Sequence, residues 1–182
     1  MVFINFNAPI VEKTCQELMA FLAEQTRKGE SEAYVLFSSG GGAVPPGVTL
    51  HNFIMSLPIR VIMHNTGIVD SIANVVFLAG AERYAVPHSS FLFHGVGFDV
   101  RQPTRFEEKQ VKERLLSIER DQQLIGEIIA GNSKLDLNKI KEMFLEAHTI
   151  TPEQAKEVGI IQEIRKVKIP TGANIQSFVF QL

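Results

Sequence analysis

The stretch Thr66-Gly67-Ile68-Val69-Asp70-Ser71-Ile72-Ala73-Asn74-Val75-Val76-Phe77-Leu78 decides how the rest of the chain is interpreted. It predicts a glycine turn that follows an apolar strand and places Ser71 at the start of an apolar helix. A helix start offers free backbone N–H groups and the positive end of a dipole, which together favour an oxyanion. Serine is also a common helix cap, so this stretch alone allows Ser71 to be either a nucleophile or a cap.

Strand and helix patterns alternate on both sides of this stretch. Strands are predicted at 2–6, 33–37, 59–64, 82–86 and 90–94, with further candidates at 160–167 and 178–180. Helices are predicted at 9–28, from 45 through 54, and at 106–129, 137–145 and 151–158. Parallel strands need crossover connections of about this length, so the order predicts an α/β fold with a mainly parallel sheet covered by helices.

Length and composition exclude several classes of protein. The chain has 182 residues, 45% of them hydrophobic, which is typical of one globular domain, placed here at 1–165 with a tail at 166–182. A net charge of −2 gives no electrostatic case for binding nucleic acid or an anionic membrane. No apolar run has the length of a membrane span and the first residues do not resemble a signal peptide, so we expect a soluble, cytoplasmic protein.

Neither a metal nor a cofactor is expected. Cys15 is the only cysteine, so it has no second thiol with which to build a zinc site or an internal disulfide. His51, His88 and His148 do not form a metal-binding spacing with carboxylates.

Four motifs spread along the chain resemble the proteolytic subunit of the Clp protease, within the wider ClpP/crotonase superfamily. They are the glycine loop Ser39-Gly40-Gly41-Gly42 with the later Gly47, the Gly-x-x-x-Ser elbow at 67–71, the stretch 79–89 that leads to His94, and the closing segment 151–161. The resemblance implies a ClpP/crotonase-like fold: repeated β-β-α/βα units, a mainly parallel sheet and a projecting handle helix at about 106–129.

The same resemblance implies a serine peptidase. Ser71 would attack a peptide carbonyl, His94 would take its proton, and backbone N–H groups of Gly41, Gly42 and Ile72 would form the oxyanion hole. The chemistry is consistent with this, because a serine hydroxyl is a poor nucleophile until a nearby base such as imidazole removes its proton.

Gly40 stands where the family usually has proline, and a further departure concerns the catalytic triad. The aspartate that completes the family's triad falls at Ala147, whose methyl group cannot orient or charge-stabilise His94. Glu146, His148 and Asp99 are the candidates for a replacement. In the serine protease template, losing the orienting carboxylate costs on the order of ten-thousand-fold in rate.

The resemblance also bears on partners. The handle helix implies a homo-oligomer, either a ring or a smaller assembly, although a charge-laced helix is also compatible with having no partner. The sequence begins at the first predicted strand, without the family's N-terminal axial loop, so we do not expect ordinary docking to a Clp ATPase. The substrate would be a peptide.

Two other functions remain open. A structural or regulatory subunit that keeps the fold but has weak or no activity is favoured by Ala147. A crotonase-type acyl-CoA enzyme would use the glycine-loop N–H groups to polarise a thioester, but such enzymes generally rely on carboxylates and have no need of Ser71.

Overall fold

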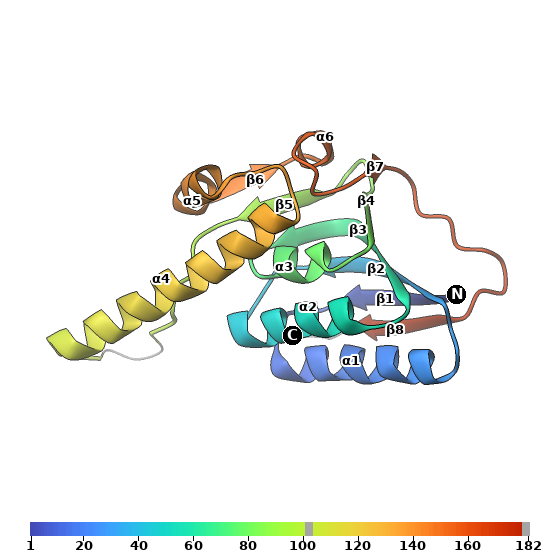
Figure 1. Cartoon of the computed structure of the whole chain (residues 1–182), viewed down its shortest axis with the longest axis horizontal. Helices are drawn as coiled ribbons and strands as arrows, with labels where there is room; N and C mark the ends of the chain where they lie inside the picture. Colours follow the sequence, from blue (N-terminus) through green and yellow to red (C-terminus); the bar gives the residue numbers. More distant parts are fainter. Residues whose placement is uncertain (101–103, 180–182) are drawn as a thin grey trace.

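The computed structural model describes residues 1–100 and 104–179. Its strands are β1 (Val2–Asn7), β2 (Glu32–Ser39), β3 (Arg60–Asp70), β4 (Glu82–Ala85), β5 (Ser90–Phe93), β6 (His148–Ile150), β7 (Glu163–Ile164) and β8 (Ile175–Val179). Its helices are α1 (Glu12–Arg27), α2 (Val44–Ser56), α3 (Ala73–Leu78), α4 (Glu108–Gly131), α5 (Leu137–Glu146) and α6 (Pro152–Glu157) (Figure 1). None of the helices within these ranges is both long and apolar enough to cross a membrane.

The strands form one sheet in the order β6-β5-β3-β2-β1-β8, with β4 paired to β3 and β7 paired to β4. Every pairing is parallel except that of β5 with β6. This confirms the predicted α/β fold with a mainly parallel sheet.

Strand β3 divides the sheet into two branches. Its residues 62–65 pair with β4, whereas residues 68–70 pair with Ser90–Leu92 of β5. The pairing with β5 keeps the chain extended through Gly67, where the sequence predicts a turn. The turn is therefore shorter than predicted and consists of Ser71 and Ile72 alone.

The two faces of the sheet are covered unequally. Because side chains alternate along a strand, Val2, Ile4 and Phe6 of β1 belong to the main core, which also contains buried side chains of α1, α2 and α3. A smaller cluster of Phe3, Tyr34, Ile62 and Tyr84 lies on the other face. The helices therefore build the larger core against one face.

Three other segments differ from the sequence prediction. Strand β6 was not expected, because three residues give too short a pattern, and it is defined by its pairing with β5. The strand expected at 160–167 is reduced to Glu163–Ile164. Near the end of the chain the strand runs over Ile175–Val179, and position 180 of the predicted strand lies outside the described residues.

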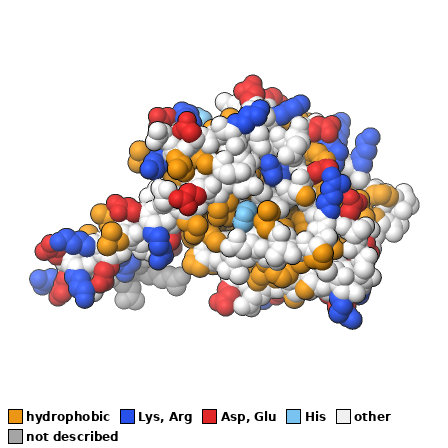
Figure 2. Space-filling model, in the orientation of Figure 1, with side chains coloured by type: hydrophobic (Ala, Val, Ile, Leu, Met, Phe, Trp, Pro, Cys, Tyr) orange, Lys and Arg blue, Asp and Glu red, His pale blue; other side chains and the backbone are white. Residues whose placement is uncertain are grey.

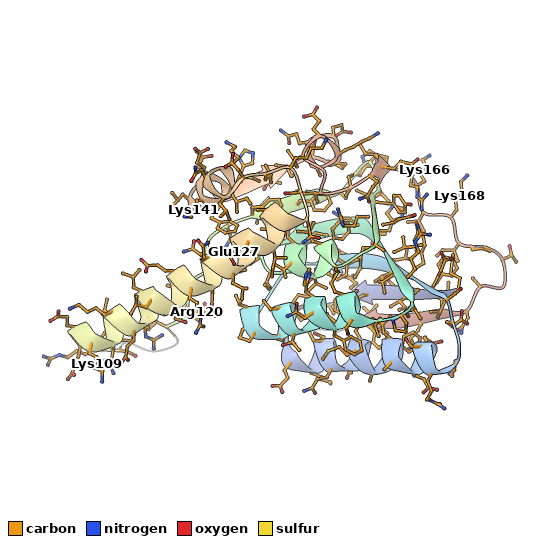
Figure 3. All side chains as sticks on the ribbon, viewed as in Figure 1. Lys109, Arg120, Glu127, Lys141, Lys166 and Lys168 are labelled. Carbon is orange, nitrogen blue, oxygen red and sulfur yellow. The ribbon has the colours of Figure 1, made fainter. Side chains whose placement is uncertain are left out.

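Helix α4 projects from the body, as expected for a handle (Figure 1). Only Ile125, Gly126 and Ile129, all in its C-terminal half, are buried. Figure 2 shows charged side chains crowding its free end. In Figure 3, Lys109 and Arg120 lie along the part away from the body and Glu127 lies nearer its base.

The C-terminal segment joins the sheet. Strand β8 pairs in parallel with β1, and the ring of Phe178 packs edge-on against Phe21 of α1 with their centroids 5.6 Å apart. The division into a domain at 1–165 and a tail at 166–182 stays a prediction.

Candidate active site

Ser71 occupies a strained turn at the end of β3. Its φ of 58° lies in the left-handed region, which is uncommon for a residue other than glycine. Its N–H donates to the carbonyl of Leu92 in β5 over 2.9 Å. Ile72, not Ser71, is the N-cap of α3, and that cap has no side-chain hydrogen bond. In the described part of the chain the N–H of Asn74 donates to the carbonyl of Ser71, that of Val75 donates to the carbonyl of Ile72, and no N–H of α3 donates to the Ser71 hydroxyl, so this hydroxyl does not cap the helix.

The glycine loop packs directly against Ser71. Gly41 has a φ of +88°, and a β carbon there would lie 2.7 Å from both the carbonyl oxygen of Asp70 and the β carbon of Ser71. Its neighbour Gly42 runs beside Ile10. The N–H of Ile10 donates to the carbonyl of Gly41, and the carbonyl of Ile10 accepts from the N–H of Ala43, each over 2.8 Å. Only a loop without side chains can approach the serine this closely.

The backbone N–H groups around Ser71 differ in availability. The N–H of Gly41 donates to Oγ of Ser39 over 3.2 Å. The N–H groups of Gly42 and Ile72 have no acceptor among residues 1–100 and 104–179. The latter two are thus free to donate to a bound group.

His94 directly follows β5 and is exposed. Its Nδ1 lies 2.8 Å from the carbonyl oxygen of Gly95. A carbonyl only accepts, so this hydrogen bond requires a proton on Nδ1 and leaves Nε2 unprotonated in the neutral ring. That tautomer is the one a general base needs at Nε2.

Ser71 and His94 line one cavity of about 680 Å³. Its wall also contains two carboxylates, Asp99 and Asp121. The remaining lining residues are mostly apolar or glycine: Val11, Gly42, Ala43, Val44, Pro45, Ile72, Phe93, Gly95, Val96, Gly97, Ile125 and Phe144. In Figure 2, hydrophobic side chains gather on the body beside the base of α4. The sequence reasoning missed Asp121, because it lies on the charged handle helix among many other charged residues.

Asp70 lies next to Ser71 and is half-buried. Burial raises the pKa of its carboxyl group, while a hydrogen bond from the Leu92 backbone and the charge of His94 act in the opposite direction. Asp70 is the last residue of β3 and α3 begins only at Ala73, so its carboxyl does not lie in the first turn of a helix.

The structure separates the three candidates for a third triad member. Glu146 and His148 face each other, with Oε2 and Nδ1 4.0 Å apart, and neither lines the cavity. Asp99 does line it. Ala147 is the left-handed C-cap of α5, with φ 52° and ψ 60°.

Ala147 nevertheless lies opposite His94 where the β5–β6 pairing ends. Phe93 pairs with His148 in the antiparallel β5–β6 ladder, and His94 and Ala147 are the next residues beyond that pair. The N–H of Gly95 then donates to the carbonyl of Phe144 over 3.0 Å. The backbone at position 147 is thus next to the end of β5 that carries His94.

Within the described ranges, no group of three or more His, Cys, Asp or Glu side chains is arranged to hold a metal ion.

Comparison with known proteins gives one consistent result. The model of the Clp protease family matches residues 2–168. The ATP-dependent Clp protease proteolytic subunit 3 of Rhizobium johnstonii is 26% identical over 165 residues, which is 90% of this chain and 81% of that protein. The ATP-dependent Clp protease proteolytic subunit of Bacteroides thetaiotaomicron is 30% identical over 135 residues, covering 71% and 58%. The corresponding subunit of Ligilactobacillus salivarius is 28% identical over 147 residues, covering 76% and 70%.

Proposed function

This chain belongs to the Clp protease family, and we propose that it is a serine peptidase in which Ser71 is the nucleophile and His94 the general base. The observation that supports this most directly is that the strained Ser71 turn and His94 line the same cavity. A serine held at positive φ in a sharp strand-to-helix turn presents its hydroxyl away from the backbone, as a nucleophile requires.

In the proposed reaction, Nε2 of His94 takes the hydroxyl proton as Oγ of Ser71 attacks the peptide carbonyl carbon. The carbonyl oxygen becomes an oxyanion, which the free N–H groups of Gly42 and Ile72 would stabilise. Collapse of this intermediate breaks the C–N bond, and the imidazolium returns its proton to the leaving amine. Water, deprotonated by the same histidine, then hydrolyses the acyl-enzyme.

Of the three glycine-loop and elbow amides expected in the oxyanion hole, Gly41 has the weakest case. Its N–H is already used by Ser39, whereas those of Gly42 and Ile72 are not used within the described part of the chain. We therefore propose that Gly41 contributes close packing and that Gly42 and Ile72 supply the donors.

The carbonyl of Gly95 would take over one of the two tasks of the missing aspartate. It fixes the tautomer of His94 but provides no full negative charge to stabilise an imidazolium. Three carboxylates are the candidates to supply part of that charge: Asp99 and Asp121, which line the cavity, and Asp70, whose carboxyl interacts with the charge of His94. Asp121 has the weakest case of the three, because it already pairs with Arg120 over 2.8 Å. We expect an enzyme that is active but slower than one with a full triad.

A second candidate is a structural or regulatory subunit with weak or no peptidase activity. Ala147 favours it, because no carboxylate stands at that position. The crotonase-type reading has less support, since a thioester enzyme would not require Ser71 to be held in a strained turn.

Proteins of this family form oligomers and act on peptides. We propose that this chain is a cytoplasmic homo-oligomer that pairs through α4, where Val111, Leu115 and Leu116 are more than half exposed. Docking to a Clp ATPase is not part of the proposal.

The test is labelling of the purified protein with a fluorophosphonate, which reacts rapidly with an activated serine hydroxyl. We expect labelling that disappears in Ser71→Ala and falls strongly in His94→Ala, while Ser56→Ala, an exposed serine of α2, leaves it unchanged. If the wild-type oligomer is not labelled, the peptidase is refuted and the structural subunit is favoured. Binding of an acyl-CoA instead would favour the crotonase-type enzyme.

A further inference from the structure

Asn74 lies on α3, three residues after Ser71, and is 2% exposed. Its Nδ2 lies 3.1 Å from the carbonyl oxygen of Ser71 and 2.9 Å from that of Leu92. The side-chain amide therefore bridges the turn that holds Ser71 and the strand β5.

The carbonyl of Leu92 also accepts from the backbone N–H of Ser71 over 2.9 Å. Leu92 is followed two residues later by His94, so the same short strand end positions the proposed base. Three hydrogen bonds to the carbonyls of Ser71 and Leu92 thus connect the serine turn to the strand that ends at the histidine.

We propose that Asn74 is a positioning residue for the reaction: its amide holds the Ser71 turn against β5 and so sets the separation of the Ser71 hydroxyl from the His94 imidazole. This inference rests on the proposed peptidase function. It assigns Asn74 no contact with the substrate.

The chemistry of the site suits an amide. Both partners are carbonyls, which only accept, and an asparagine Nδ2 offers two hydrogens on a short side chain. Serine, threonine or a protonated aspartate has only one, and an ionised aspartate has none. The oxygen of the same amide differs, because the buried Oδ1 has no hydrogen-bond partner within the described residues. A buried oxygen without a hydrogen bond is rare in folded proteins and costs stability. The two hydrogen bonds of Nδ2 are therefore the favourable contribution of an amide at this position.

Positioning matters more here than in a site with a full triad. No carboxylate at position 147 orients His94, and the hydrogen bond of its Nδ1 goes to the adjacent Gly95. The alignment of the two reacting groups then depends largely on how the serine turn and the end of β5 are fixed to each other. A misplacement of about 1 Å at a reacting centre can cost roughly a hundredfold in rate.

Asn65 provides a matched control. It is fully buried, its Nδ2 donates to the carbonyl of Ser90 in the same strand over 2.9 Å, and its Oδ1 accepts from the N–H of Gly67 over 3.0 Å, but no hydrogen bond joins its side chain to Ser71. Asn65→Ala and Asn74→Ala both remove one buried amide that binds β5. They differ in what else is lost: Asn74→Ala takes a donor from the carbonyl of Ser71, whereas Asn65→Ala takes the acceptor from the N–H of Gly67.

The experiment measures the second-order rate of fluorophosphonate labelling and the thermal unfolding midpoint for wild type, Asn74→Ala, Asn65→Ala and His94→Ala, and for both double variants with His94→Ala. We expect Asn74→Ala to lower the labelling rate by about tenfold to a hundredfold, and Asn65→Ala to lower it by much less at a similar loss of midpoint. We also expect the His94→Ala change to cost less in the Asn74→Ala background than in wild type, because the histidine is already misaligned.

Each other outcome contradicts the inference. If both asparagine variants lose labelling in proportion to their midpoints, or if Asn74→Ala and His94→Ala act independently, Asn74 has a structural role only. If wild type is labelled and Asn74→Ala labels equally fast, the positioning role is refuted while the peptidase stands. If wild type is not labelled at all, the peptidase is refuted and the positioning role with it.

Discussion

Gly41 and Ser71 are in such close contact that a β carbon on Gly41 would lie 2.7 Å from the β carbon of Ser71. Real β carbons do not approach this closely, so the glycine loop and the serine turn fix each other's position.

Replacing Gly41 by alanine adds that β carbon and also forces a non-glycine residue to φ +88°. We expect a loss of roughly 1–3 kcal/mol in the free energy of unfolding from overpacking, with left-handed strain in addition. Fluorophosphonate labelling should fall at least tenfold, since the displaced groups are Ser71 and its neighbour. Chemical denaturation and labelling kinetics measure both.

The control is Gly40→Ala in the same loop, where the nearest atom to an added β carbon is Cδ1 of Ile68 at 4.0 Å. It should change neither quantity appreciably. Equal effects at the two glycines would mean that loop flexibility, and not the contact with Ser71, is what matters.

Restoring a carboxylate at position 147 should raise activity. Ala147→Asp places an acid beside the strand end that holds His94, and aspartate tolerates the left-handed conformation at φ 52° better than alanine. We expect labelling to accelerate at least tenfold, with a ceiling of about ten-thousand-fold from the serine protease template.

The matched variant is Ala147→Gly, which relieves backbone strain without adding a charge. It should raise the thermal midpoint slightly and leave the labelling rate near that of wild type. If glycine accelerates labelling as much as aspartate, then strain at the end of α5, and not the missing carboxylate, limits the reaction.

Stability should fall as the pH is lowered from 7 to 5. Burial lowers the pKa of His51 and of His64 in the folded protein. In the unfolded chain these histidines have their ordinary pKa of about 6.5, so as the pH falls through that value the unfolded state binds protons that the folded state does not. The free energy of unfolding should therefore decrease with falling pH, by up to about 1.4 kcal/mol per pH unit for each histidine.

Urea unfolding at several pH values measures this slope. His64→Gln should flatten it, whereas His88→Gln, a change at an exposed residue, should not. A wild-type slope that survives in His64→Gln and in His51→Gln alike would assign the pH dependence to other groups.

Arg83 should be one of the most sensitive positions for stability. Its guanidinium donates to the carbonyls of Gly80, Asn132, Gly159 and Ile160 over 2.7–3.3 Å, which joins the end of α3 to the segments after α4 and α6. Arg83→Lys loses the planar fork and leaves several carbonyls without a donor, so we expect a cost of at least about 2 kcal/mol. Urea unfolding measures it.

Arg60→Lys is the comparison, because Arg60 makes exposed ion pairs with Glu32 and Glu82 and lies at the start of β3. Exposed pairs contribute about 0–1 kcal/mol. Similar losses at both arginines would contradict the distinction between the half-buried Arg83 network and the surface pairs.

The sequence was sufficient for the regular parts of the fold. Strands such as 33–37 are continuous apolar runs, and helix 106–129 has a repeating pattern, so both were predicted within a few residues. The predictions were wrong where pairing between strands overrides the conformational preference of the local sequence. Gly67 is extended because 68–70 pairs with β5, and His148–Ile150 is a strand only because β5 lies beside it.

For the candidate site, motif spacing pointed to Ser71, His94 and the glycine loop. In the structure Ser71, His94 and Gly42 of that loop line one cavity, and Gly41 packs against Ser71. Their catalytic roles stay predictions. Contacts that depend on three-dimensional packing gave no signal in the sequence. The amide of Asn74 and the carbonyl of Gly95 belong to ordinary residues, and only the folded backbone shows what they face.

The pairing of β8 with β1 also affects how the protein should be handled. The family match ends at residue 168, before β8 begins at Ile175. A shortened version cut at that boundary would leave β1 as an unpaired edge rich in Val, Phe and Ile, which is a template for sheet-to-sheet aggregation between molecules. Expression trials should therefore keep the chain through Val179, even though the family pattern does not require it.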